Sequence, residues 1–161
     1  MLPKRICVIG NGYVGSVVSA CLAHVGHHVT GVEQDGERLE RLRAGKAPFH
    51  EPGLEPLLLR SLSSGQLRFV ADISEGLEGS EVVFVCVGTP PGGDGLPDMT
   101  AMSDVAKSIA ANLAHRQVIV TKSTVPIGTG RWLASMIREH LGAASCGDEV
   151  FAVVANPEFL R

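Results

Sequence analysis

A glycine loop near the N-terminus is the feature that most constrains the fold of this chain. The segment GNGYVG (residues 10–15) matches the pattern G-x-G-x-x-G, follows the apolar residues 6–9 directly and opens a stretch of helical period. At such a junction the first glycine makes a tight turn, the second lets a diphosphate approach the backbone, and the third lets the helix pack on the strand. Unpaired N–H groups at the helix start favour an anion. The loop predicts a dinucleotide site, with an ordinary strand-to-helix turn as the alternative, and its cofactor-binding residues would be Gly10, Gly12, Tyr13, Val14 and Gly15.

An acidic residue at the end of the second apolar run supports the same interpretation. Glu33 follows the loop by about the 20 residues at which dinucleotide folds place the acid that binds the adenosine ribose. A carboxylate there would accept hydrogen bonds from the ribose hydroxyls and repel a 2'-phosphate, which favours NAD over NADP. Arg38, about one helical turn further on, is a candidate for ribose or phosphate contact. The alternative for Glu33 is a solvated acid at a strand end.

The rest of the chain alternates apolar runs with segments of helical period. Continuous Val/Ile runs suit strands that are covered on both faces, as in a parallel sheet. The pattern predicts an α/β fold with a doubly wound, six-stranded, mostly parallel sheet (Rossmann fold) in one domain, residues 1–161. The expected strands are residues 5–9, 29–32, 68–70, 82–87, 118–121 and 151–155, and the expected helices are residues 13–25, 36–44, 54–63, 99–114 and 128–141. Two long Gly/Pro-rich loops, residues 45–53 and 88–98, are candidates for functional loops.

Charge and composition exclude several classes of partner. Fourteen basic against 17 acidic residues give a net charge of -3, so no broad cationic surface would attract nucleic acid. No apolar run approaches the roughly 20 residues that span a bilayer, so we expect a cytoplasmic chain without a membrane partner. The cysteines, at positions 7, 21, 86 and 146, have no paired spacing and are expected to be reduced. The six histidines have no metal-ligand spacing, so no metal is expected.

Further candidates follow the predicted later strands, because ligands of open parallel sheets bind beyond the carboxyl ends of the strands. Two segments there supply hydroxyls and compact backbone where a nicotinamide ribose would lie, with turn or helix-cap roles as the alternative. The cofactor-binding candidates of the two segments are Val87, Gly88, Thr89, Ser123 and Thr124. Glu158, which follows the last expected strand, would be either a base or a solvated acid.

Five motifs, in order along nearly the whole chain, resemble the NAD-binding domain of the UDP-glucose/GDP-mannose dehydrogenase family. They are "GNGYVG", "EPGLEPLL" from residue 51, "VGTPPGGDGLPD" from residue 87, "KSTVPIGTG" from residue 122 and "NPEFLR" from residue 156. The resemblance implies an enzyme that oxidises the C6 alcohol of a UDP-sugar to a carboxylate in two steps with two NAD. It also implies that Thr124 positions a catalytic water or the substrate oxygen and that Glu158 acts in acid/base chemistry and thioester hydrolysis. The implied substrate-binding residues are Glu158, Phe159, Leu160 and Arg161. The family commonly has Asp at the position of Glu33.

The nucleophilic cysteine of that family lies in a downstream Gly-x-Cys motif that these 161 residues lack. We therefore expect an N-terminal fragment, without the central helix and the C-terminal UDP-sugar-binding domain, that binds NAD but does not turn over. The expected substrate of the whole enzyme is UDP-glucose, and the expected assembly is a homodimer or larger, with the fragment a monomer or weak dimer. The alternatives are a GDP-mannose or UDP-N-acetyl-mannosamine dehydrogenase fragment, or a stand-alone NAD-binding regulatory module.

Overall fold

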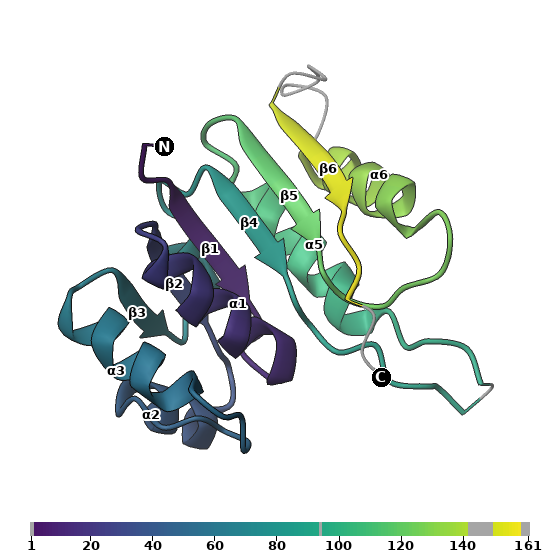
Figure 1. The fold of residues 1–161 in the computed structure, drawn as a ribbon. Coiled ribbons are helices and arrows are strands. Elements are labelled where there is room, and N and C mark those ends of the chain that lie inside the picture. The colour runs from purple at the N-terminus through teal and green to yellow at the C-terminus, as the bar shows by residue number, and fades with distance from the viewer. Residues whose placement is uncertain (1, 94, 142–149, 159–161) are drawn as a thin grey trace.

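Six parallel strands form one sheet in the order β3-β2-β1-β4-β5-β6 (Figure 1). The computed structural model describes residues 2–93, 95–141 and 150–158. The strands are β1 (Arg5–Ile9), β2 (His28–Val32), β3 (Leu67–Val70), β4 (Val82–Val85), β5 (Gln117–Thr121) and β6 (Phe151–Ala155). The helices are α1 (Tyr13–His24), α2 (Gly36–Arg43), α3 (Leu54–Ser63), α4 (Ile73–Leu77), α5 (Thr100–Asn112) and α6 (Thr129–Leu141).

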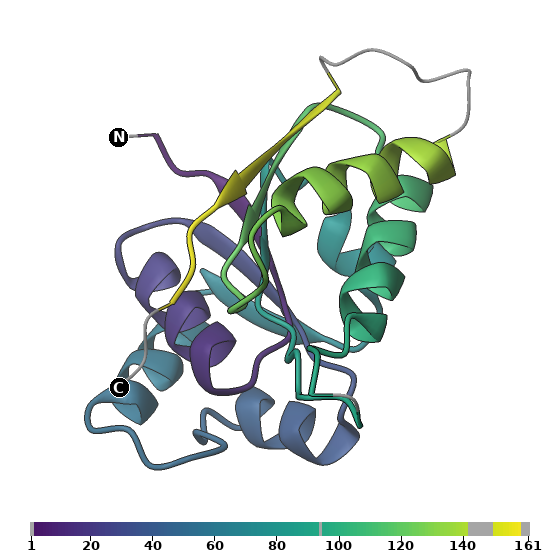
Figure 2. The same ribbon diagram turned by 90° about the vertical axis from the view of Figure 1, so that its right-hand side faces the viewer.

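Alternate residues of the central strand enter two different hydrophobic cores, because successive side chains of a strand point to opposite faces. Ile6 and Val8 of β1 pack into the core that includes residues of α1, α2 and α3. Cys7 and Ile9 pack into the core that includes residues of α4, α5 and α6. Figure 2 shows the sheet nearly edge-on, with α5 and α6 to one side of it. Burial on both faces is what the uninterrupted apolar runs predict.

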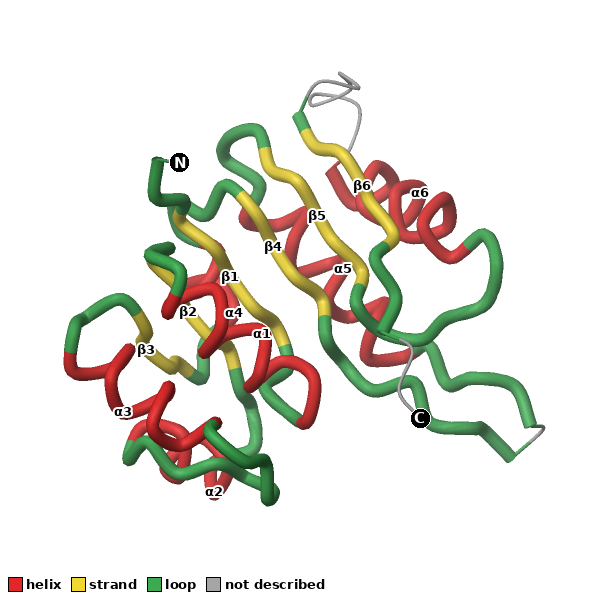
Figure 3. Tube along the Cα trace, in the orientation of Figure 1, coloured by secondary structure: helices red, strands yellow, loops and turns green. Residues whose placement is uncertain are grey.

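The chain order reverses between β1 and β4, which both pair in parallel with their neighbours. β1 leads into α1 and β4 leads towards α5, and these helices belong to the cores on opposite faces. The loops that leave the two strands therefore separate and open a crevice at the carboxyl edge. In Figure 3 several loops gather at this edge, below the sheet.

The doubly wound fold predicted from the sequence is confirmed, and the expected strands and helices are present with ends shifted by a residue or two. The fourth strand ends at Val85 rather than at residue 87. The structure adds α4, which the sequence analysis missed because five residues are too few to display a helical period. A local signal was available, since the Asp72 side chain caps this helix by accepting a hydrogen bond from the Ser74 N–H.

Within the described residues, no helix is long and apolar enough to cross a membrane. Position 146, predicted to be a reduced cysteine, and residues 159–161, predicted to bind substrate, lie outside the described residues.

Candidate dinucleotide site

The three glycines of the loop have different surroundings. Gly10 has φ of +85°, and a Cβ atom there would lie 3.0 Å from the Cys86 carbonyl oxygen. A Cβ on Gly15 would lie 1.8 Å from the Gly10 carbonyl oxygen, so only glycine permits this helix-to-loop contact. At Gly12, in contrast, a Cβ would meet nothing within 4 Å. The protein's own packing therefore requires Gly10 and Gly15, whereas the space beside Gly12 is free for a ligand.

A cavity of about 1070 Å³ extends along the carboxyl ends of the strands, from the end of β2 to the segment after β6. Such a volume is at the upper end of the range for small-molecule and cofactor sites. Among the described residues, every predicted site residue except Gly15 lines it: Gly10, Gly12, Tyr13, Val14, Glu33, Arg38, Val87, Gly88, Thr89, Ser123, Thr124 and Glu158. The fold thus brings together candidates from the whole length of the chain.

At the β2 end of the cavity, three hydrogen bonds hold the carboxylate of Glu33. Its Oε1 accepts from the Asp35 N–H at 3.0 Å, and its Oε2 accepts from the Asn11 N–H at 3.1 Å. The Arg38 guanidinium donates to Oε2 at 3.1 Å. Glu33 is only 5% exposed, so the site can hold this carboxylate in one orientation. A carboxylate has about four acceptor positions, so about one remains for a ribose hydroxyl.

Asn11, which the sequence analysis did not single out, is fully buried between the glycines. Its side-chain N–H₂ group donates to the carbonyl oxygens of Val8 and Val32, and its Oδ1 accepts from the Ser19 hydroxyl. The G-x-G-x-x-G pattern leaves this position open, so the motif gave no signal for it.

At the other end of the cavity, three hydroxyls tie the segments after β4, β5 and β6 together. Thr89 Oγ1 donates to the Thr124 carbonyl oxygen at 2.9 Å, and Thr124 Oγ1 donates to that of Glu158 at 3.3 Å. Ser123 Oγ donates to the Val87 carbonyl oxygen at 2.6 Å. Each hydroxyl donates to the main chain but keeps acceptor capacity towards the cavity.

Lys122, the first residue after β5, forms an ion pair with Glu158, and the distance from Nζ to Oε2 is 2.6 Å. The side chain of Lys122 is 12% exposed and that of Glu158 is 37% exposed. The Glu158 N–H also donates to the Lys122 carbonyl oxygen at 3.2 Å. The pair could have been anticipated, because neighbouring parallel strands end side by side, and here a cation follows one strand and an acid follows the next.

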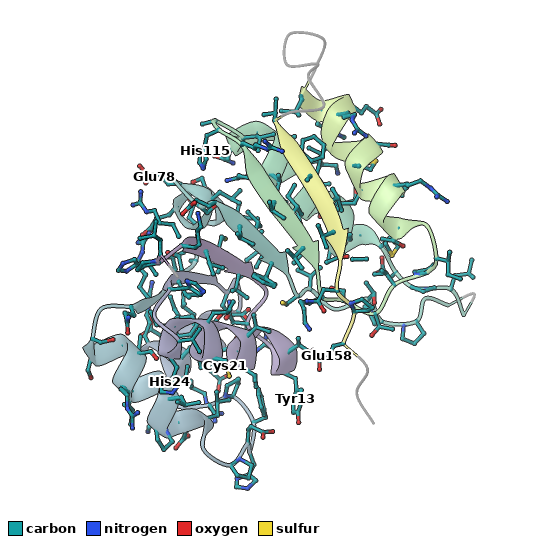
Figure 4. The ribbon with its side chains drawn as sticks, turned by 45° about the horizontal axis from the view of Figure 1, so that its top comes forward. Tyr13, Cys21, His24, Glu78, His115 and Glu158 are labelled. Atoms are coloured by element: carbon teal, nitrogen blue, oxygen red, sulfur yellow. The ribbon has the colours of Figure 1, made fainter. Side chains whose placement is uncertain are left out.

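Figure 4 places the labelled Glu158 beyond the arrowhead of β6, on the same side of the molecule as Tyr13, and places Glu78 and His115 on the opposite side. The carboxyl edge of the sheet therefore carries both the glycine loop and the acid. A second hollow, lined by Glu78 and His115 among others, lies apart from it.

Cys86 lines the cavity directly after β4. Burial raises the pKa of this thiol to about 12, although the nearby Lys122 ammonium acts to lower it and Glu158 acts to raise it. Burial also raises the pKa of Cys7 to about 12. Because a thiol attacks as its thiolate, neither cysteine is an activated nucleophile at neutral pH.

The loop over residues 45–53 packs against the start of α1. The rings of Tyr13 and Phe49 lie 4.3 Å apart between centroids, and the Tyr13 hydroxyl donates to Glu51 Oε2 at 3.2 Å. That hydrogen bond to the Glu51 carboxylate raises the pKa of Tyr13. Pro48 and Phe49 line the cavity, so this loop, which holds the first residues of the EPGL motif, forms one of its walls.

The described part of the chain contains no group of three or more His, Cys, Asp or Glu side chains arranged to hold a metal ion.

Comparison with protein families matches residues 4–161 to the UDP-glucose/GDP-mannose dehydrogenase family, NAD binding domain. The chain belongs to this family. The chain is 46% identical over 157 residues to a UDP-glucose 6-dehydrogenase of Pseudomonas aeruginosa, covering 98% of this chain and 34% of that protein. A GDP-mannose 6-dehydrogenase of Pseudomonas putida is 38% identical over 160 residues, with 98% and 36% covered.

Solved structures agree with the family assignment. A UDP-glucose dehydrogenase of Pyrobaculum islandicum superimposes with a TM-score of 0.88 at 38% identity, covering 99% of this chain and 37% of that one. A ternary complex of the GDP-mannose dehydrogenase of Pseudomonas aeruginosa gives a TM-score of 0.90 at 36% identity, with 98% and 36% covered. The chain spans about a third of the length of the curated relatives it matches.

Proposed function

We propose that this chain is the NAD-binding part of a UDP-glucose 6-dehydrogenase, an enzyme that oxidises UDP-glucose to UDP-glucuronate with two NAD in the cytoplasm. The family assignment gives the NAD-binding domain. The observation that carries the sugar assignment is the 46% identity to a UDP-glucose 6-dehydrogenase, compared with 38% to GDP-mannose 6-dehydrogenases. A GDP-mannose or UDP-N-acetyl-mannosamine dehydrogenase is the alternative, because solved enzymes of both kinds share the fold.

The cavity along the carboxyl edge would hold NAD, because its described residues offer groups suited to each part of the coenzyme. The free space beside Gly12 would accept the diphosphate, and the N–H groups of Tyr13 and Val14 at the start of α1 would bind it. Glu33 and Arg38 would hold the adenosine ribose. The nicotinamide end would lie against Val87, Gly88, Thr89, Ser123 and Thr124. NAD held there would supply the hydride acceptor for oxidation of the sugar carbon.

Thr124 and Glu158 are the proposed catalytic residues. Both line the nicotinamide end of the cavity, and the Thr124 hydroxyl donates to the main chain of Glu158. With its donor used in this way, the hydroxyl oxygen is free to accept a hydrogen bond from a water or from the sugar C6 hydroxyl. The Glu158 carboxylate, paired with Lys122, would accept the proton of the sugar C6 hydroxyl through a water that also donates to Thr124. Residues 158–161 would contact the nucleotide sugar.

The chain alone is proposed to bind NAD without turnover. Acid formation from an aldehyde needs a nucleophile, and the thiols of Cys7 and Cys86 are both protonated at neutral pH. Turnover would then require residues of a longer protein, which we propose to assemble as a homodimer or larger. A stand-alone NAD-binding regulatory module is the second candidate function, favoured by the presence of a six-stranded dinucleotide fold within 161 residues.

Calorimetric titration of the chain with NAD and with NADP tests the coenzyme assignment. We expect tighter binding of NAD, because the buried carboxylate of Glu33 would face the 2'-phosphate of NADP. Equal affinities would contradict the role of Glu33.

Reading the gene beyond Arg161 separates the enzyme from the module. A continuous frame with a Gly-x-Cys motif supports the enzyme, and a stop codon supports the module. For the enzyme, we expect two NADH per UDP-glucose and little NADH with GDP-mannose, measured by absorbance. Faster turnover of GDP-mannose would overturn the sugar assignment.

A further inference from the structure

We propose that Asn11 is a positioning residue for the coenzyme, which holds the glycine loop in its binding shape and directs the carboxylate of Glu33. Both the affinity for NAD and the preference for NAD over NADP would then depend on this residue. The inference rests on the proposed NAD site, and it assigns a role to a position that the glycine motif leaves unspecified.

The side chain of Asn11 joins β1, β2 and α1, the three elements that surround the glycine loop. Its N–H₂ group donates to the carbonyl oxygen of Val8 in β1 and to that of Val32 in β2, both at 3.0 Å. Its Oδ1 accepts from the Ser19 hydroxyl of α1 at 2.7 Å. The residue has no exposed surface, and both donors of its amide are used. A buried amide that is paired in this way has one low-energy orientation, which fixes the residue relative to both strands and the helix.

The main chain of Asn11 is held as well. Its carbonyl oxygen accepts from the Ser16 hydroxyl at 2.6 Å, and its N–H donates to Glu33 Oε2 at 3.1 Å. The glycines on either side are tied only through their main chains, since the Gly10 N–H donates to the Val32 carbonyl oxygen at 3.0 Å and the Gly12 carbonyl oxygen accepts from the Ser16 N–H at 3.1 Å. Asn11 is thus the side-chain anchor that helps to order the loop before a ligand arrives, which reduces the entropy that binding must offset.

The contact to Glu33 links this anchor to coenzyme selectivity. The Asn11 N–H and the Arg38 guanidinium share Oε2, while Oε1 is held by the Asp35 N–H. Without a fixed Asn11, Oε2 loses its main-chain donor and keeps only Arg38, so the carboxylate can follow the flexible Arg38 side chain out of its present orientation. A carboxylate that is no longer directed at the ribose repels a 2'-phosphate less. Loss of Asn11 should therefore weaken NAD binding more than NADP binding.

The variant Asn11→Ala tests this proposal, with Asn112→Ala as the matched control. Asn112 also donates a side-chain hydrogen bond to a main-chain carbonyl, that of Ser108 at 2.8 Å, but it lines the separate hollow near His115. Both variants are titrated with NAD and NADP at a temperature where circular dichroism shows each fully folded. We expect Asn11→Ala to lower NAD affinity about tenfold or more, to lower NADP affinity less, and Asn112→Ala to change neither.

The milder variant Ser19→Ala keeps the test decisive if Asn11→Ala does not fold. It removes one of the partners of the Asn11 amide and should weaken NAD binding about threefold, since only one hydrogen bond is lost. Unchanged NAD affinity in a folded Asn11→Ala, or in Ser19→Ala if only that variant folds, would overturn the positioning role. Equal losses for NAD and NADP would overturn the link to Glu33. Absence of NAD binding by the unaltered chain would instead refute the coenzyme site itself.

Discussion

Replacing Gly12 with valine is expected to abolish NAD binding and leave the fold intact. A Cβ on Gly12 meets nothing within 4 Å, although its backbone, with φ of -72° and ψ of -145°, lies just beyond the β region that other residues prefer. Valine there should therefore lower the free energy of unfolding by about 1–2 kcal/mol through backbone strain, too little to unfold a domain of ordinary stability. The valine side chain would fill the space through which the diphosphate approaches the N–H groups at the start of α1.

The expected loss follows from the hydrogen bonds that the diphosphate could no longer make. Each bond from a main-chain N–H to a charged oxygen contributes about 1.5–3 kcal/mol, so the loss of two weakens binding by about 3 kcal/mol or more. That corresponds to a dissociation constant raised more than about 100-fold. Isothermal titration calorimetry measures this constant, and urea denaturation measures the stability.

The matched variant Gly15→Ala should show the reverse order of effects. Its Cβ would lie 1.8 Å from the Gly10 carbonyl oxygen, a main-chain atom that no rotamer change can move away. Alanine gains about 1 kcal/mol in helix propensity, but overpacking of this severity costs about 3 kcal/mol and decides the outcome. Binding of NAD by Gly12→Val with an unchanged dissociation constant, or wild-type stability of Gly15→Ala, would refute the division of roles among the glycines.

Three further predictions concern the end of the cavity that Lys122, Glu158 and Cys86 line. Glu158→Gln should destabilise the fold by about 2 kcal/mol, because it leaves the largely buried Lys122 ammonium unpaired. The loss is below the roughly 3–5 kcal/mol of a fully buried pair because the Glu158 side chain is 37% exposed. The double variant Lys122→Met/Glu158→Gln should recover most of that loss in urea denaturation, and equal stability of the single and double variants would contradict the pairing. The Cys86 thiol should resist iodoacetamide at pH 8 while the exposed Cys21 reacts, as peptide mass spectrometry would show. Folding raises the pKa of the Cys86 thiol from 9.0 to about 12, so the protonated thiol contributes fully to the free energy of unfolding below pH 9, and this contribution is lost as the pH rises towards 12. The variant Cys86→Ala lacks the thiol, so its free energy of unfolding should fall less between pH 9 and pH 12 than that of the unaltered chain.

The outline of the site was predictable because each part depends on local sequence. Gly10 needs a positive φ, and Glu33 follows a strand whose apolar run is evident. In a parallel sheet all strands end at the same edge, so residues such as Thr89 and Thr124 were expected to meet there. Regular hydrophobic periods and parallel topology together place these residues without knowledge of side-chain contacts.

The contacts that tie the site together were less predictable. Asn11 occupies a variable position of a motif, and its importance appears only when β1, β2 and α1 surround its amide. α4 is too short to show a period. The raised pKa of Cys86 arises from burial by segments distant in sequence, which no local pattern encodes.

The sequence by itself determined the order of the strands and of every helix but α4, the parallel sheet and the family, because hydrophobic period and glycine placement are properties of short segments. Tertiary structure decided which glycine is free for a ligand, how the carboxylates of Glu33 and Glu158 are paired, and that Asn11 is the anchor of the loop. These features depend on distances between residues far apart in the chain, and such distances exist only once the strands have packed side by side.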